Sequence, residues 1–579
     1  MTSTYSIAIN WLASNERVET SPVNEKKWIK YYFGFGSLLI GGVSVALRVC
    51  CGDVFEKQGA LNISLTALQF LITLFMSELP LCLMMNLFLK TREKETQIER
   101  DTPLCVMNYN IKAACEEDIK QCFRNCEVSY QLNSNDNIYM AIVSSTRDET
   151  LMKYEFELSK QLKSKYHEKF HYLYRPGSCL KKCGQYHDLM MFIKNNSQSR
   201  DYTDDKYGIY KRNKEMLFDI SKSSANISLL QGLKFKYILV LDSDNKITNL
   251  RLLMSIAERN PSFSIFQPYV YLTGDTSFYQ YIFSTISNTI SNAKEVFFER
   301  MEHCSFYGKG LINIEKYIQE IIQTDAIPVN CMSHDTFESM FLPCKYVKEV
   351  SISETYPTSH CSWSIRENRW NVGDLQVFIH HTPFHIFRKK NFKLSFQKTF
   401  IALSSFRSII FRPLSFLFII LHALLRFSTV TYIGLLWSIF ISTGISSVLL
   451  IIESKKKKRY PTRRIVLSIL LSILFYIPET ITGSIRFISS IKNSLMYVKW
   501  IPSSIIERKS LAEGHVRSSF NEFWLSLFIG TVISYKLGYD NPFLLVVSVS
   551  TILLPFTSSL TAASFCIPRV VFAYPDLET

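Results

Sequence analysis

The chain has 579 residues, 47% of them hydrophobic and 20% charged, with a formal net charge of +15. This length allows two or more domains. The basic residues lie between and beside apolar runs, as at 455–464, and not among interleaved aromatic residues. That pattern favours a cytoplasmic membrane face over a nucleic-acid groove. We therefore expect the lipid bilayer, and no nucleic acid, as a partner.

The 14 cysteines form no recognisable disulfide framework, which indicates a reducing compartment for the soluble part. Cys122 and Cys126 are one helical turn apart, as are Cys179 and Cys183. Neither pair has a histidine at zinc-finger spacing, so we expect ordinary helix packing and no metal at these cysteines.

A polar tail is predicted over residues 1–30, without a cleavable signal peptide, because the first apolar run starts late and lacks a cleavage site. Two apolar runs follow, at 31–50 and 65–89, and each is long enough to span a bilayer. The second run contains Glu78, which is costly in lipid and should face protein or lie near an interface. Basic residues at 90–94 place this end inside the cell.

Residues 101–390 have the composition of a soluble domain in which short apolar runs alternate with helical patterns. This alternation predicts a parallel α/β sheet with functional loops at the carboxyl ends of its strands. Strands are expected at 104–109, 138–145, 170–175, 236–242 and 263–270, and helices at 116–130 and 249–260.

Five further apolar runs lie within 391–570, which brings the candidate spans to seven, ahead of a short tail at 571–579. The loops at 453–464 and 487–520 are both basic, yet a full span between them would put them on opposite sides of the membrane. We therefore predict a re-entrant or in-plane helix at 465–485, interrupted by Pro478, and six full spans with both termini inside. The five runs are 408–427, 430–452, 465–485, 522–538 and 542–562.

The segment YILVLDSDNK, residues 237–246, ends a hydrophobic strand in two carboxylates. Asp242 and Asp244 could hold a hard divalent cation, Mg²⁺ or Mn²⁺, and through it a diphosphate. The alternative is an ordinary Asp-rich turn.

A second candidate site is NCMSHDTFESMF, residues 330–341, where His334 and Asp335 precede Glu338 by about one helical turn. Asp335 and Glu338 could act as a general acid and base. Alternatively, Ser333 or Asp335 caps a helix and Glu338 closes a capping box. The two interpretations are compatible, because a helix N-terminus favours an ionised carboxylate.

A third candidate is SIRENRWNVGDLQVF, residues 364–378. Arg366 and Arg369 would share one face of a helix, where their guanidinium groups could bind phosphates. Trp370 offers an apolar platform for a sugar. The alternative is a basic interfacial helix anchored by this tryptophan.

These three motifs, in this order and between apolar runs, resemble the plan of processive membrane glycosyltransferases of family 2, which include cellulose, chitin and hyaluronan synthases. That family usually carries Gln-x-x-Arg-Trp as its last motif, and Arg366 stands at the Gln position here. RENRWNVGDLQ, residues 366–376, is more similar to the glycosyltransferase module (family 84) of bacterial cyclic β-1,2-glucan synthases, which has Arg-x-x-Arg-Trp followed by Gly-Asp-x-Gln.

Further segments resemble the same family in the same order, over about 65–570. They are FMSELPLCLMMNLF (75–88), KKCGQYHDLMMF (181–192), FYGKGLINIEKY (306–317), SHDTFES (333–339) and SETYPTSH (353–360). The family usually carries an Asp near Ser145 for a uridine contact, and here the nearest carboxylate is Asp148. No segment matches the family's phosphorylase-like module, so the resemblance does not extend to cyclisation or product length.

The resemblance implies a GT-A-type α/β domain between transmembrane helices, in a bacterial inner membrane and facing the cytosol. It implies an inverting hexosyltransferase that polymerises glucose from UDP-glucose onto a glucan acceptor or primer. The implied catalytic residues are Asp335 as base, with Arg366, Arg369 and Trp370; Asp242 and Asp244 bind the metal; the implied substrate contacts are Asp242, Asp148, Lys182, Lys309, Glu338, Asp374 and Gln376.

Two other functions stay open at this point. One is another family 2 β-glycan synthase that makes chitin-, cellulose- or mannan-like chains. The other is a non-catalytic transporter or scaffold, which the clean apolar late helices disfavour. A hydrolase using Asp335 and Glu338 is weaker still, because glycosidases do not need an Asp-x-Asp metal site.

Overall fold

The computed structural model divides into two compact units, which are described separately. The first comprises residues 1–93, 286–302 and 414–470, and the second comprises 94–285, 303–413 and 471–579. Residues 1–21 of the predicted tail at 1–30, the whole predicted tail at 571–579 and most of the predicted span at 430–452 lie outside the described residues. The structure describes residues 22–50, 59–89, 95–99, 101–177, 180–195, 197, 199–202, 213–274, 276–324, 326–327, 331–381, 396–424, 444–455, 460–494, 503–537 and 542–562.

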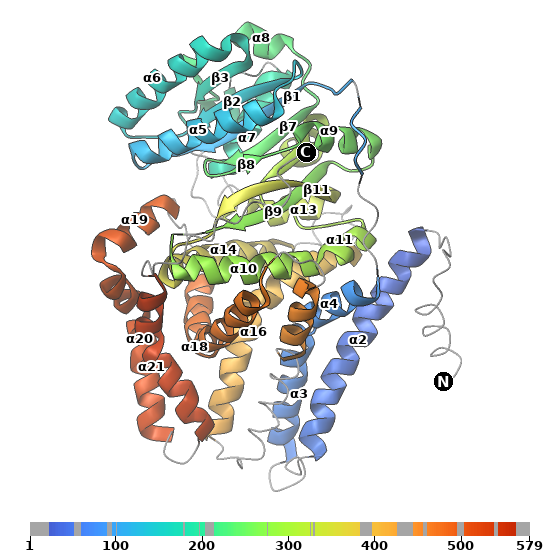
Figure 1. Ribbon diagram of the computed structural model, residues 1–579, viewed down its shortest axis with the longest axis vertical. Helices are drawn as coiled ribbons and strands as arrows, with labels where there is room; N and C mark the ends of the chain where they lie inside the picture. The colour runs from blue at the N-terminus through green and yellow to red at the C-terminus, as the bar shows by residue number, and fades with distance from the viewer. Residues whose placement is uncertain are drawn as a thin grey trace. The chain divides into compact units, whose positions relative to one another are not determined.

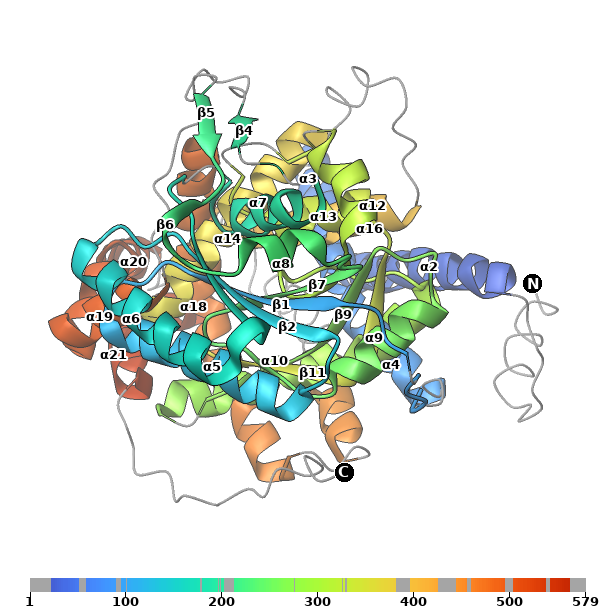
Figure 2. The same cartoon turned by 90° about the horizontal axis from the view of Figure 1, so that it is seen from above.

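A nine-stranded sheet organises the second unit (Figures 1 and 2). Its strand order is β6-β3-β2-β1-β7-β10-β9-β11-β8. A separate hairpin pairs β4 (Ser199–Tyr202) with β5 (Asn213–Met216). The strands of the main sheet are β1 (Cys105–Ile111), β2 (Ile138–Ser144), β3 (Phe170–Tyr174), β6 (Asp219–Ser224), β7 (Tyr237–Asp242), β8 (Lys246–Ile247), β9 (Ile265–Thr273), β10 (Gly310–Asn313) and β11 (Cys344–Thr355).

The predicted strands are confirmed, but the sheet is mixed and not parallel. The ladders from β3 through β2 and β1 to β7 are parallel. By contrast, β10 runs antiparallel to both β7 and β9, and the edge strands β6 and β8 are antiparallel to their neighbours. Strand direction was not predictable, because alternation reports which residues are buried and carries no information on pairing. The four residues of β10 are also too short for a periodic signal.

Helices cover both faces of the sheet in the second unit. On one face, every second residue of β1 packs with apolar residues of α5 (Glu116–Asn133) and α9 (Leu250–Arg259) in the core. On the other face, Gln185 of α7 (Lys181–Asn195) donates hydrogen bonds to the carbonyls of Ile111 and Val143, at 2.9 and 3.1 Å. Figure 2 shows α5 and α6 (Glu149–Tyr166) opposite α7 and α8 (Ile227–Gly232) across the strands.

The first unit contains α2 (Pro22–Cys50), α3 (Gly59–Met76), α4 (Glu78–Phe88) and α11 (Glu295–Met301). The predicted apolar run at 65–89 is therefore two helices, which break at Ser77. Glu78 is buried, and one of its carboxylate oxygens lies 2.7 Å from the ammonium group of Lys294. The expectation that this residue faces protein is confirmed.

The remaining helices follow the predicted apolar runs and the loops around the sheet. The predicted break at Pro478 is absent, since α18 continues through this proline as one helix of 33 residues. These helices are η1 (His167–Lys169), α10 (Phe278–Ala293), α12 (Ile314–Tyr317), a π-helical turn η2 (Ile318–Ile322), α13 (His334–Phe341), α14 (His360–His381), α16 (Phe396–Leu424), α18 (Thr462–Ser494), α19 (Ser503–Glu513), α20 (His515–Leu537) and α21 (Pro542–Ala562).

One described helix segment, Ser404–Leu421 within α16, is long and apolar enough to cross a bilayer. A second would be the pair Ile63–Leu74 and Glu78–Phe88, bent by 42°, if the two helices form one span. This is weak support for membrane integration. The six-span arrangement, the cytosolic orientation and the domain boundaries stay predictions.

Candidate functional site

The candidate site begins at the carboxyl end of β7, next to the same end of β1. Asn110 of β1 pairs in register with Asp242, the last residue of β7. β1 is the point at which the parallel strand order divides, toward β2 on one side and toward β7 on the other. In open α/β sheets ligands bind at such a point, outside the carboxyl ends of the strands.

The turn that carries Asp242 and Asp244 is held by side chains of neighbouring elements. The amide N–H of Asp242 donates to Oδ1 of Asn245 at 2.9 Å. Asn125 of α5 donates to the carbonyl of Ser243 at 2.9 Å, and the hydroxyl of Tyr109 donates to the carbonyl of Asn245 at 3.0 Å. These bonds fix both carboxylates at the strand end.

Two lysines predicted from the sequence meet at Asp242. The Lys182 ammonium group, from α7, lies 2.6 Å from Oδ1 of Asp242, and that of Lys309 lies 3.5 Å from Oδ2. Lys182 also donates to the carbonyl of Gly308 at 2.7 Å. Gly308 has φ = +71°, a conformation that side-chain-bearing residues rarely adopt, so the Gly-Lys-Gly loop can approach α7 closely.

Glu354, near the end of β11, completes this group and was given no role from the sequence. It forms ion pairs with Lys309 and with Arg366, whose Nη2 lies 2.5 Å from Oε1 of Glu354. Its side chain is buried. A signal existed, because Glu354 lies near the carboxyl end of a strand as Asp242 does. We call Asp242, Asp244, Lys182, Lys309, Glu354 and Arg366 the Asp242 cluster.

The charges of the cluster divide its carboxylates into two kinds. Burial raises the pKa of Asp242, but Lys182 and Lys309 outweigh it and hold that pKa below its usual range. Burial also raises the pKa of Glu354, but Lys309 and Arg366 together outweigh it and lower this pKa to about 2. For Asp244, burial and the nearby Glu354 and Asp242 raise the pKa to about 6.

These residues fit a divalent cation. Carboxylate oxygens are the ligands that Mg²⁺ and Mn²⁺ prefer. Asp244 has no basic group in direct contact among the described residues. Its pKa is raised by burial first and then by the negative charge of Glu354 and Asp242, which a cation would neutralise. The donor set is therefore suited to a hard ion at Asp242 and Asp244.

Asp335 lies in the first turn of α13, close to the Gly-Lys-Gly loop. A Cβ atom on Gly308 would lie 3.8 Å from Cβ of Asp335 and 3.6 Å from the Lys182 ammonium group. Burial raises the pKa of Asp335, with Glu338 acting in the same direction and His334 and Lys182 against it. A carboxylate with a raised pKa is suited to accept a proton near neutral pH.

The predicted capping box at this helix is wrong. Ser333 occupies the N-cap position but makes no capping hydrogen bond through its side chain. Glu338 does not turn back to the N-terminus, because it accepts hydrogen bonds from the hydroxyls of Tyr186 and Tyr317 inside the protein. The hydrogen bonds from these buried hydroxyls are favoured over a cap at the helix N-terminus, because a buried carboxylate without partners would be costly.

One face of α14 presents the predicted arginines and tryptophan to the cluster. The Arg366 guanidinium lies over the Trp370 ring, 4.8 Å from its centroid. Trp370 is 40% exposed, so one of its surfaces stays available to a ligand. Burial, and then the charge of Arg366, lower the pKa of Arg369 to about 10. The interfacial-helix alternative does not account for the contact between Arg366 and Glu354.

The adjacent residue of α14 belongs to a different group of charges. Glu367 Oε2 lies 2.7 Å from Nη1 of Arg412 in α16 and 2.8 Å from Nη2 of Arg486 in α18. Arg486 also pairs with Glu479 of its own helix. All four side chains are largely buried, so this network attaches α14 to α16 and α18.

The second half of α14 contacts the segment that leads to Asp335. A Cβ atom on Gly373 would lie 2.2 Å from Oγ of Ser333, so only glycine permits this approach. The Thr336 hydroxyl donates to Oδ1 of Asp374 at 3.1 Å, and the Met332 amide donates to Oε1 of Gln376 at 3.0 Å. Asp374 and Gln376 thereby hold the Asp335 segment in place.

We expect Asp374→Asn to change how stability depends on pH. Burial, and then the Asp335 carboxylate, raise the pKa of Asp374 from 3.8 to about 7. Between these values the folded chain keeps a proton that the unfolded chain has released, so the stability contributed by Asp374 is lost as pH rises toward 7. The variant cannot ionise, and its free energy of unfolding should exceed that of the wild type by on the order of 4 kcal/mol near pH 8.

Thermal unfolding of both chains from pH 4 to pH 8 measures this effect. The two unfolding curves should converge at the acid end. Asp101→Asn, which changes an exposed carboxyl, should leave the pH dependence as it is. Parallel curves for the wild type and Asp374→Asn across this range would contradict the prediction.

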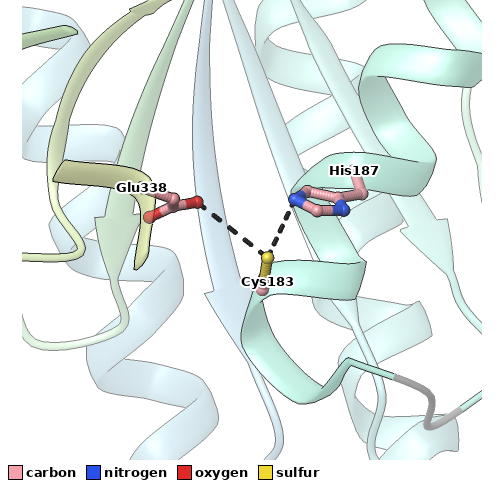
Figure 3. A group of neighbouring side chains, drawn as sticks. All are labelled: Cys183, His187 and Glu338. Atoms are coloured by element: carbon pink, nitrogen blue, oxygen red, sulfur yellow. Dashed lines mark hydrogen bonds between the residues drawn. The ribbon is translucent and has the colours of Figure 1, made fainter. Parts of the chain in front are cut away.

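Two of the predicted substrate contacts have other partners in the structure. Asp148 is exposed and caps α6, where its Oδ1 accepts a hydrogen bond from the Leu151 amide at 2.9 Å. Glu338 lies in a buried group with Cys183 and His187 (Figure 3), and it accepts hydrogen bonds from the two tyrosines. The structure thus brings together Asp242, Asp244, Lys182, Lys309, Asp335, Arg366, Arg369 and Trp370, with Asp374 and Gln376 behind Asp335.

No protein-family profile and no curated protein sequence matches the chain. Among solved structures, the chain is similar to mannosyltransferase PcManGT from Pyrobaculum calidifontis in complex with GDP-Man and Mn²⁺. The TM-score is 0.39 at 10% identity, over 76% of this chain and 99% of that chain. A similarity at this level carries no argument about function, which must come from the geometry of the site.

Proposed function

We propose that the chain is a membrane-bound inverting glycosyltransferase that uses a nucleotide sugar and a divalent cation. The observation that carries the proposal is the Asp242 cluster beside Asp335. Carboxylates for a hard cation, four basic side chains and a carboxylate of raised pKa come from separate segments and meet at the carboxyl ends of strands. This is the combination that transfer from a sugar diphosphate requires.

The basic residues would act on the leaving group. Lys182, Lys309, Arg366 and Arg369 match in number the carboxyl groups near them, which are Asp242, Asp244, Glu354 and Asp335, so these bases and a bound cation together would offset the charge of a diphosphate. Guanidinium groups are suited to phosphate oxygens. Mg²⁺ or Mn²⁺, held by Asp242 and Asp244, would supply further charge neutralisation when bound.

Asp335 and Trp370 would act on the acceptor. Asp335 would take the proton of the attacking hydroxyl at a carboxylate oxygen, as the hydroxyl displaces the diphosphate from the anomeric carbon in one step. The exposed surface of Trp370 would stack the acceptor sugar. Asp374 and Gln376 would position Asp335 through their hydrogen bonds with Thr336 and Met332, which flank it in the chain.

For the finer assignment we propose UDP-glucose as donor and a β-1,2-linked glucan as product. The run from Arg366 to Gln376 supports it, since it resembles cyclic β-1,2-glucan synthases more than family 2 enzymes with Gln at the first position. Another β-glycan synthase is the alternative within the same chemistry. We keep Asp148 as a proposed substrate contact from the resemblance alone, whereas Glu338 is fully buried and accepts hydrogen bonds from Tyr186 and Tyr317 instead.

Nucleoside diphosphate release from a panel of sugars tests this function. The full chain, in detergent, would be assayed with UDP-glucose, UDP-galactose, UDP-N-acetylglucosamine and GDP-mannose, followed by linkage analysis of the product. We expect release with UDP-glucose that depends on Mg²⁺ or Mn²⁺ and is lost in Asp242→Asn and Asp244→Asn. If the diphosphate is released only with another nucleotide sugar, that sugar replaces UDP-glucose as the proposed donor. Absence of release with the whole panel would overturn the proposed class.

A further inference from the structure

A second group of metal-ligating side chains lies between α7 and α13, away from the carboxylates of the Asp242 cluster. Cys183 and His187 are one turn apart on α7, and Glu338 comes from α13 (Figure 3). Their ligand atoms, one from each residue, all lie within 4.8 Å of one another, and the three side chains are fully buried. From this geometry we propose that Cys183, His187 and Glu338 bind a structural zinc ion that joins α7 to α13.

The distances between the donor atoms lie on both sides of the separation expected for a tetrahedral ion. Sγ of Cys183 lies 2.8 Å from Nε2 of His187 and 3.9 Å from Oε1 of Glu338. Two donors on tetrahedral zinc are about 3.5 Å apart, because Zn–S and Zn–N bonds are about 2.3 and 2.0 Å long. Small side-chain rotations therefore bring all three onto one ion. The hydroxyl of Tyr317, 2.7 Å from Nε2 of His187, is within reach as a fourth donor.

The chemistry of the donors selects zinc over the cation of the Asp242 cluster. A thiolate with an imidazole binds Zn²⁺, whereas Mg²⁺ and Mn²⁺ prefer oxygen donors alone. Glu338 is also held in the way that ligating carboxylates are held. Tyr186 and Tyr317 donate to its Oε1, and Nδ1 of His334 lies 3.2 Å from Oε2.

The position of this zinc site gives it a role distinct from that of the Asp242 ion. Cys183 directly follows Lys182, which contacts Asp242, and Glu338 is one helical turn after Asp335. An ion bound here would hold the phosphate-binding lysine and the proposed base at a fixed separation, without touching substrate. Structural zinc sites stabilise the fold in this manner.

The competing explanation is a hydrogen-bond network without an ion. In that network the two tyrosines donate to Glu338, and His187 bonds with Tyr317. In such a network Cys183 contributes little stabilisation, because a thiol is a weak hydrogen-bond donor. The histidine at the i+4 position of a cysteine, both buried, favours the metal.

Zinc content of the full chain tests the proposal. The chain, purified in detergent without added zinc or chelator, should contain stoichiometric zinc by inductively coupled plasma mass spectrometry. Cys183→Ser and Glu338→Gln should lose it. Cys126→Ser, a matched change of a buried cysteine on α5, should keep it, and so should Asp244→Asn, which removes a ligand of the other cation.

A second measurement uses the wild type alone, so it tests the proposal even where the variants fail to fold. Zinc removal from the wild type by 1,10-phenanthroline should lower its melting temperature, and zinc but not magnesium should restore it. Cobalt(II) in place of zinc should give a thiolate-to-metal charge-transfer band. If the wild type contains no zinc, and neither chelator nor added zinc changes its melting temperature, the proposal is overturned in favour of the hydrogen-bond network. None of these readouts depends on transferase activity.

Discussion

Asp335→Asn should lower the turnover of sugar transfer by about 100- to 10,000-fold, the usual range for loss of a general base. The asparagine keeps the size of the side chain but cannot accept a proton from the acceptor hydroxyl. Nucleotide-sugar binding should persist, because Lys182, Lys309 and Arg366 are unchanged. Initial rates of diphosphate release and titration of UDP-glucose by calorimetry separate the two effects.

The control for this variant is Asp136→Asn, which changes an exposed carboxyl in the loop before β2. It should be as active as the wild type. The rate of the wild type should also fall in acid, as Asp335 becomes protonated, since burial raises the pKa of this carboxyl. Full activity of Asp335→Asn would remove the residue from the role of base.

Lys309→Met should have the largest effect on stability, about 3–5 kcal/mol in the free energy of unfolding. Lys309 is buried between Asp242 and Glu354, and its removal leaves Asp242 and Glu354 each with one counter-charge fewer. A buried charge without its partner costs more than the pair contributes. Denaturant unfolding of the full chain measures the difference, and nucleotide-sugar binding should weaken as well.

Two comparisons make the Lys309 result specific. Lys236→Met removes an ion pair with Glu258, 2.7 Å long, but the lysine is half exposed, so the cost should be less than about 1 kcal/mol. Adding Glu354→Gln to Lys309→Met should recover part of the loss, because the carboxylate that lost one of its two counter-charges is gone. Equal effects of the two single lysine variants would contradict the buried-pair argument.

The parts of the fold that were predictable are those with a local signal. The strand before Asp242 and the helix at 116–130 follow from apolar periodicity, and the structure has both, as β7 and α5. The approach of Lys309 to Asp242 was implied by the resemblance. It could not be derived from the residues, because 67 positions separate them and local patterns carry no distance over such a span.

The contacts that could not be predicted from the sequence are those between residues far apart in the chain. Glu354 comes from a strand far along the chain, and its partners Lys309 and Arg366 are identifiable only once β11 and α14 are placed. Glu338 suggested a helix cap by its spacing, yet tertiary hydrogen bonds from Tyr186 and Tyr317 determine its direction. His187, four positions after Cys183, is a local sign of the buried group, but this spacing is not that of a zinc finger.

The two charge groups on α14 limit how this helix can change during evolution. Arg366 faces Glu354, while its neighbour Glu367 faces Arg412 and Arg486. Each residue of an α-helix is rotated by about 100° from the previous one. A substitution alters one contact, but one residue inserted or deleted between them would turn one group of side chains away from its partners. Homologous chains should therefore tolerate changes of residue type in α14 far better than changes of its length.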